Sequence, residues 1–232
     1  MIRANGLYLY EEIMLLALRG KEGTVAAGAM VNHAVGGAIL AELLLSGRVG
    51  IEKPRPRRQL VTVIDSEPVG DELIDECLVR IAGARRRRAP ANWVSAFASM
   101  RGLKNRVAEC LCRRGILEEE RDNILLFFTR RIYPEINPEP EQKLLRQLGD
   151  AIFSDSDDVD ARTVTLVSLA GSANVLPAVF DKRRLKARKK RITQLANGEV
   201  TGKATREAIA AMQAATTVAA MMPAVIASSA SH

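Results

Sequence analysis

Aromatic side chains are scarce in this sequence, and their scarcity limits the fold classes that it can adopt. Aromatics make up 4% of the 232 residues, which argues against a β-sandwich with an aromatic core. Hydrophobic residues make up 47%, which excludes a wholly disordered chain. We therefore expect a mostly α-helical fold.

Metal ligands are also few. The sequence has two histidines, His33 and His232, and no second cysteine pair beside Cys110 and Cys112 to complete a zinc site. These two cysteines and Cys77 form no disulfide-rich pattern, so we expect reduced thiols in a cytoplasmic protein. The sequence predicts no metal site and no cofactor.

Catalytic motifs are missing as well. The chain has no glycine-rich phosphate loop followed by lysine, no Gly-x-Ser-x-Gly and no His-Glu-x-x-His. The adjacent acids Glu11 and Glu12 point in different directions on a helix and cannot share one proton. We expect that the protein is not an enzyme, and we assign no catalytic residue.

Long apolar stretches are limited to the alanine-rich segment 208–227. Polar residues and a proline interrupt it, so we favour a buried terminal helix over a membrane anchor. The first ten residues lack the pattern of a secretory signal. We expect the chain to stay inside the cell.

Apolar residues recur at helical spacing through most of the chain, and Asp71 is a predicted N-cap. The predicted helices span residues 7–18, 26–45, 71–82, 90–97, 103–115, 139–153, 160–171, 176–196 and a tail from 205. Gly36 and Gly37 fall inside the second of these, where either close packing or a ligand would explain them. Two hairpins are also predicted, with strands at 47–52 and 59–64 around a basic loop and at 116–120 and 124–129 around a polar turn at 121–123.

Positive charge is the strongest functional signal. Lysine and arginine total 34 against 27 acids, a net charge of +7, which suggests a polyanionic partner such as a membrane or nucleic acid. The basic residues cluster at 53–58, 85–88, 101–106, 130–131 and 182–191. No aromatic residues interleave these clusters and no RNA-recognition or zinc-finger pattern is present, so nucleic acid is not favoured. A solvated helix is the alternative interpretation of cluster 182–191.

Arg101 and Lys104 stand apart from the other cations. Their i, i+3 spacing places both charges on one face of a helix N-terminal turn, where free backbone N–H groups also favour an anion. The pair is a candidate phosphate pocket, although many solvated helices carry the same spacing.

An uninterrupted apolar run spans Ile124, Leu125, Leu126, Phe127 and Phe128 in the second predicted hairpin. A buried strand is one interpretation of such a run. The other is a hairpin whose exposed side chains insert into a membrane while the arginines at 130 and 131 contact phosphates. We predict Leu125, Leu126, Phe127 and Phe128 as membrane-insertion residues.

The order of motifs along the chain resembles the Golgi phosphoprotein 3 family. The motifs that carry the resemblance lie at 7–12, 21–23, 36–49, 70–76, 93, 115–117 and 123–127. The resemblance implies one domain over residues 1–232, built around a central helix bundle with small β-hairpins. It also implies a protein that binds phosphatidylinositol-4-phosphate on the cytosolic face of Golgi membranes.

The family's headgroup pocket matches this chain in part. Arg101 and Lys104 look like its Arg-x-x-Arg pair, with a conservative change at the second position. Gly28 and Gly36 stand where the family has a pocket tryptophan and a further arginine, and Trp93 resembles a separate structural tryptophan. The short stretch before residue 7 suits a bacterial-type member, since eukaryotic members carry a flexible arm there.

These observations together predict a peripheral membrane protein on the cytosolic membrane face, at the Golgi if the source is eukaryotic. Its expected partners are an anionic lipid, a phosphoinositide by resemblance, and the cytosolic tails of membrane proteins. Two alternatives stay open: a basic protein-interaction adaptor without lipid specificity, and a nonspecific nucleic-acid binder.

Overall fold

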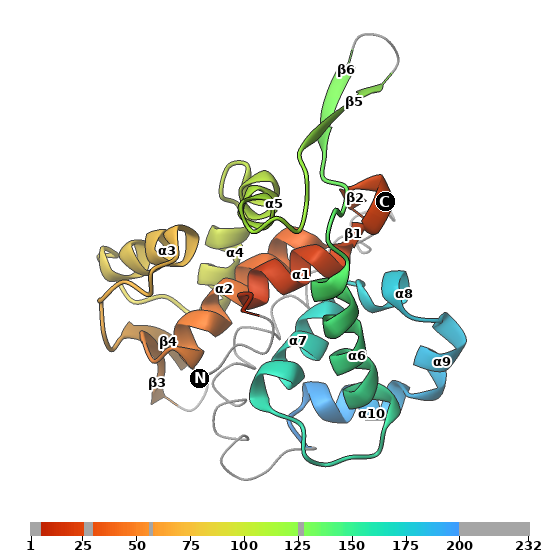
Figure 1. Cartoon of the computed structure of the whole chain (residues 1–232). Coiled ribbons are helices and arrows are strands. Elements are labelled where there is room, and N and C mark those ends of the chain that lie inside the picture. The colour runs from red at the N-terminus through yellow and green to blue at the C-terminus, as the bar shows by residue number, and fades with distance from the viewer. Residues whose placement is uncertain (1–5, 26–29, 56–57, 125–127, 200–232) are drawn as a thin grey trace, which may run out of the picture.

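The computed structural model describes residues 6–25, 30–55, 58–124 and 128–199, and in them the fold is mostly α-helical, as predicted (Figure 1). The longer helices are α1 Leu9–Ala17, α2 Val31–Leu45, α3 Glu72–Ala82, α4 Pro90–Ala98, α5 Leu103–Arg113, α6 Glu139–Phe153 and α7 Ala161–Ser172. Three short helices follow, α8 Leu176–Val179, α9 Lys182–Ala187 and α10 Lys189–Ala196.

Most predicted helices are confirmed, with differences at their ends. The helix expected from residue 26 begins at Val31, and the segment expected as one helix over 176–196 is divided into α8, α9 and α10. The α3 cap is confirmed, because the Asp71 carboxylate accepts a hydrogen bond of 3.0 Å from the Ile74 N–H. The tail predicted from residue 205, including 208–227, lies outside the described residues.

The described strands form two-stranded antiparallel sheets. The pairs are β1 Leu18–Arg19 with β2 Thr24–Val25, β3 Val49–Arg55 with β4 Arg58–Val63, and β5 Glu120–Ile124 with β6 Phe128–Ile132. The first pair encloses a 3₁₀ turn at Gly20–Glu22 and was not predicted. The β3–β4 hairpin is confirmed, but its strands extend into the segment that we expected to be a basic loop.

The β5–β6 hairpin is also confirmed, whereas its predicted register is wrong. Ile124 pairs with Phe128, so residues 125–127 connect the strands and the polar residues 121–123 lie within β5. In this register Asp122 lies opposite Arg130, and the Arg130 guanidinium lies 2.7 Å from the Asp122 carboxylate, a favourable cross-strand contact.

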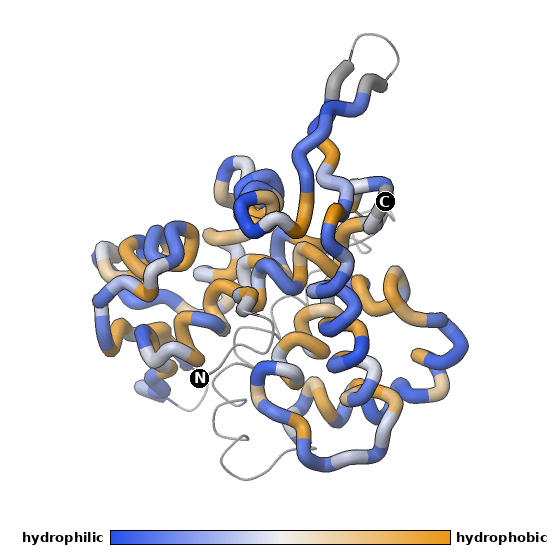
Figure 2. Tube along the Cα trace, viewed as in Figure 1, coloured by the Kyte–Doolittle hydropathy of each residue, from blue (hydrophilic) through white to orange (hydrophobic). Residues whose placement is uncertain are grey.

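Helices α1 and α2 form the centre of the core. Every residue of α1 is buried, and α2 packs against α1, α4 and α7. A helix covered on several sides needs apolar side chains around most of its circumference, and α2 has them (Figure 2).

Gly36 lies where α2 crosses α4. A Cβ atom at this position would sit 2.6 Å from the Val94 carbonyl oxygen and 3.1 Å from the Ala98 nitrogen. The absent side chain therefore allows the two helices to approach closely. Of the two explanations offered for this glycine, the structure supports close packing.

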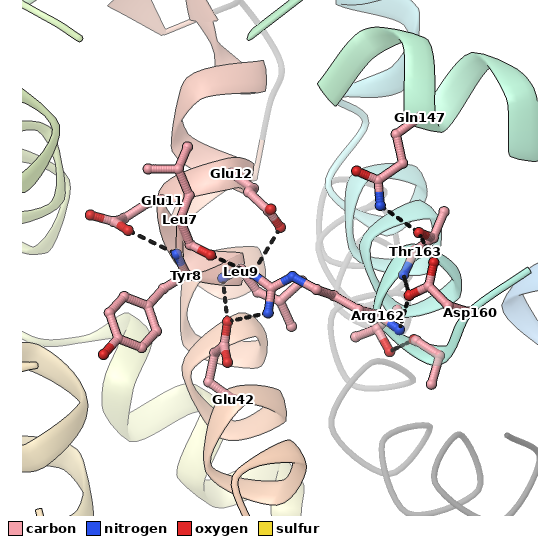
Figure 3. Close-up of polar contacts among 12 residues, drawn as sticks. Leu7, Tyr8, Leu9, Glu11, Glu12, Glu42, Gln147, Asp160, Arg162 and Thr163 are labelled. Atoms are coloured by element: carbon pink, nitrogen blue, oxygen red, sulfur yellow. Dashed lines mark hydrogen bonds and ion pairs between the residues drawn. The ribbon is translucent and has the colours of Figure 1, made fainter. Parts of the chain in front are cut away.

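A buried ion cluster joins α1, α2 and α7 (Figure 3). The Arg162 guanidinium donates to Glu42 Oε1 at 2.7 Å, to Glu12 Oε2 at 3.1 Å and to the Leu7 carbonyl at 2.7 Å. Glu42 Oε1 also accepts a hydrogen bond of 2.6 Å from the Leu9 N–H. Burial raises the pKa of Glu12 to about 7, and the Arg162 charge opposes this rise.

Glu11, next to Glu12 in α1, has different partners, because adjacent residues on a helix point in different directions. Glu11 accepts from the Tyr8 N–H at 2.8 Å and from Arg114 Nε at 2.6 Å. Burial raises the pKa of Glu11, while the Tyr8 hydrogen bond and the Arg114 charge lower it. Glu11 and Glu12 therefore each serve a separate structural contact.

Part of the basic cluster 182–191 is structural, contrary to its interpretation as a solvated helix. Arg188 Nε donates to the Ile152 carbonyl at 2.9 Å, and Arg191 Nε donates to the Ala151 carbonyl at 3.3 Å. These carbonyls belong to the last turn of α6, where the helix leaves them without backbone partners. The two arginines thus cap α6.

Candidate lipid-binding site

Arg101 and Lys104 are both exposed at the start of α5, but only Lys104 belongs to the helix. The helix begins at Leu103 after the N-cap residue Gly102, so Arg101 lies in the preceding turn, not on the first helical turn as expected. Gly102 provides no side chain to cap the helix. Among the described residues, no acid pairs with Arg101 or Lys104, so both charges are available to an anion.

A cavity of about 280 Å³ lies beside Lys104. Its polar lining combines α5 with the base of the β5–β6 hairpin and the β1–β2 turn, through Thr24, Lys104, Asn105, Arg130, Arg131 and Tyr133. The cavity collects three cations, and Lys104 is the one that the sequence analysis assigned to a pocket. Arg101 does not line it.

Gly23 holds the β1–β2 turn against the base of the hairpin. Its φ is +59°, and a Cβ atom there would sit 2.3 Å from the Pro134 nitrogen. The Tyr133 N–H donates to the Gly23 carbonyl at 2.9 Å, and the Glu135 N–H donates to the Gly20 carbonyl at 2.9 Å. This close contact sets the wall of the cavity opposite α5.

The β5–β6 hairpin extends away from the helices at the end of the molecule that also carries α5 (Figure 1). Its base is charged. Arg131 lies 2.8 Å from Glu109 and 3.5 Å from Glu119, and it faces Arg121 across the strands. Like charges in register repel each other, and the two acids beside Arg131 offset this repulsion.

Three of the four predicted insertion residues come between Ile124 of β5 and Phe128 of β6 in the sequence. Leu125, Leu126 and Phe127 lie outside the described residues, and Phe128 is the first residue of β6. Within the described ranges β5 and β6 pair with each other and with no further strand, so neither is the central strand of a larger sheet there. The position is compatible with the insertion interpretation and leaves it a prediction.

The structure also bears on the pocket positions where this chain has glycine. Gly28 lies outside the described residues. Position 36 faces α4 so closely that no larger side chain fits there without a shift of the helices. Trp93 is buried in α4, with the Arg88 guanidinium 5.1 Å from its ring centroid, in agreement with a structural role.

Sequence reasoning missed several lining residues. Asn105 and Thr24 are polar residues without a recognisable motif, and Tyr133 is the first residue after β6. One signal was available: Thr24 directly follows the Lys-Glu-Gly motif that carries the family resemblance.

None of the helices that the structure describes has the length and apolar character needed to cross a bilayer.

The described fold defines a mostly α-helical protein from which one hairpin projects. Residues 9–212 match the Golgi phosphoprotein 3 (GPP34) family, and the chain belongs to this family of Golgi-associated proteins. Vacuolar protein sorting-associated protein 74 from Eremothecium gossypii is 26% identical over 209 residues, covering 77% of this chain and 62% of that protein. The chain thus spans less than two thirds of the length of this curated relative.

Proposed function

We propose that this protein is a non-catalytic, adaptor-type peripheral membrane protein that binds anionic lipid on the cytosolic face of a membrane. In this proposal Arg101 and Lys104 contact the headgroup, and membership of the family supports a headgroup of the phosphatidylinositol-4-phosphate type. Where the source has a Golgi, its membranes are the site of action.

One observation carries the proposal: three features that suit an anionic membrane occupy the same end of the molecule. They are Arg101 and Lys104, which have no acidic partner among the described residues, the cavity beside Lys104 and the projecting hairpin. A headgroup phosphate accepts hydrogen bonds from lysine, arginine and free helix N–H groups. Each well-placed surface cation adds about 1 kcal/mol of attraction to an anionic leaflet.

Replacing Arg101 and Lys104 together by alanine is expected to weaken binding to vesicles containing phosphatidylinositol-4-phosphate by at least about a hundredfold. Charge-assisted hydrogen bonds contribute about 1.5–3 kcal/mol each, and two of them are removed. The melting temperature should not change, because both side chains are exposed. Vesicle titration with a fluorescent lipid reporter measures the loss.

The matched control is alanine at Arg183 and Lys190, which are also exposed and have no acidic partner among the described residues. This variant has the same net charge as the first one. If both variants lose the same amount of binding, diffuse charge explains the attraction and the headgroup site at α5 is wrong.

Leu126→Asp is expected to weaken vesicle binding about tenfold or more without lowering the melting temperature. An aspartate on an inserted hairpin loses apolar contact with the acyl chains and adds repulsion from anionic headgroups. Leu111→Asp is the comparison, because Leu111 is fully buried in α5 and its replacement should destabilise the fold by several kcal/mol. Unfolding by Leu126→Asp would instead show that the apolar run belongs to the core.

A further inference from the structure

A second cationic site lies away from the hairpin, where β4 meets the C-terminal end of α3 and the N-terminal end of α4. It is an open groove of about 1300 Å³, called here the arginine groove. Its rim carries Arg58, Arg80, Arg85, Arg86, Arg87 and Arg88, and none of the described residues that line it is acidic. The groove therefore selects for negative charge.

Half of these arginines are already engaged. Arg80 lies 2.7 Å from Glu76, Arg87 pairs with Glu52, and Arg88 covers the Trp93 ring. Arg58, Arg85 and Arg86 are exposed and have no acidic partner in the part of the chain that the structure describes. Three unneutralised guanidinium groups thus face one groove.

The segment that carries the arginine run is held in place and is not a free loop. The Val61 N–H of β4 donates to the Arg88 carbonyl at 2.9 Å, which ties the segment to the outer edge of the hairpin. The Gly83 N–H continues the hydrogen bonding of α3 to the Val79 carbonyl at 2.9 Å. Arginines on an ordered segment lose less conformational entropy when they bind.

The floor of the groove decides which anion fits. The lining between the arginines, called here the floor, is mostly apolar, with Leu60, Ala84, Ala89 and Ala96 beside the polar Gln59 and Asn92. Trp93 is 3% exposed and lies beneath Arg88, so it offers no ring on which a nucleic-acid base could stack. An apolar floor under a cationic rim complements a chain in which acidic and apolar side chains alternate.

We propose that the arginine groove binds a short extended acidic peptide of a partner protein, with carboxylates on the arginine rim and apolar side chains on the floor. Arginine suits this role because its planar fork binds a carboxylate through two hydrogen bonds. The groove also exceeds the usual volume of a small-ligand pocket, which favours a peptide over a single phosphate compound.

Fluorescence anisotropy on the full chain tests the proposal, with a labelled peptide of alternating glutamate and leucine as the probe. We expect saturable binding, and a loss of about tenfold or more for Arg85→Gln combined with Arg86→Gln. The control variant, Arg183→Gln combined with Lys190→Gln, should bind as the unaltered protein does. A glutamine–leucine peptide and a glutamate–serine peptide should both bind more weakly.

Three results would overturn the proposal. The first is equal binding of the glutamine–leucine peptide, and the second is unchanged affinity in the Arg85 and Arg86 variant. The third is absence of peptide binding, whether or not a single-stranded oligonucleotide or inositol hexakisphosphate binds through the same arginines. These results leave the lipid proposal unaffected, because that proposal assigns vesicle binding to Arg101 and Lys104, which do not line the arginine groove.

Discussion

Arg162→Met is expected to lower the free energy of unfolding by about 3–5 kcal/mol, the usual range when one partner of a buried ion pair is removed. The substitution leaves Glu42 and Glu12 without their cationic partner in the core, where their side chains are 8% and 2% exposed. It also removes the donor to the Leu7 carbonyl. Urea denaturation followed by circular dichroism measures the change.

Two further variants make this prediction specific to the buried cluster. Arg80→Met removes an exposed i, i+4 pair with Glu76 and should change stability by less than about 1 kcal/mol. Adding Glu12→Gln and Glu42→Gln to Arg162→Met should restore part of the lost stability, because no unpaired charge is then buried. A loss below 1 kcal/mol for Arg162→Met alone would show that the cluster does not hold α1, α2 and α7 together.

Gly36→Arg, which places an arginine where the family pocket has one, is expected to destabilise the fold and to add no lipid affinity. Even Gly36→Ala should cost about 2–3 kcal/mol, because its Cβ would meet the Val94 carbonyl at 2.6 Å and the helices would have to separate. The arginine adds the cost of a buried charge, so its effect should be larger. Thermal denaturation and vesicle titration test the two parts of the prediction.

Gly149→Ala in α6 is the control for these variants. Its Cβ would lie 3.9 Å from the nearest Phe180 atom, an ordinary contact, so alanine should stabilise the helix by up to about 1 kcal/mol. If Gly36→Arg folded with unchanged stability and bound lipid more tightly, close packing of α2 on α4 would not be the reason for glycine at this position.

Local signals were sufficient to predict most helices. Apolar spacing gave α1, α3, α6 and α7, and the capping preference of aspartate gave the start of α3 at Asp71. The register of the β5–β6 hairpin could not be obtained in this way. Turn propensity placed residues 121–123 in the loop, but the Asp122–Arg130 ion pair across the strands is a contact that propensity does not consider.

The candidate site, like the fold, could be predicted only in part from local signals. Spacing and charge indicated Arg101 and Lys104, because both lie within three residues of each other and need no partner. The cavity beside Lys104 also requires Thr24 and Tyr133, which are far apart in the sequence and meet only through the Gly23 contact. The Arg162 cluster was missed for the same reason, since its partners Glu12 and Glu42 come from distant helices.

Co-sedimentation with liposomes tests the central claim most directly. The account predicts strong retention on vesicles with phosphatidylinositol-4-phosphate, weaker retention on phosphatidylserine vesicles and little on neutral phosphatidylcholine. Retention should fall as salt rises, because the Debye length shrinks from about 8 Å at physiological ionic strength to about 3 Å at 1 M. Equal retention on neutral and anionic vesicles would contradict the account.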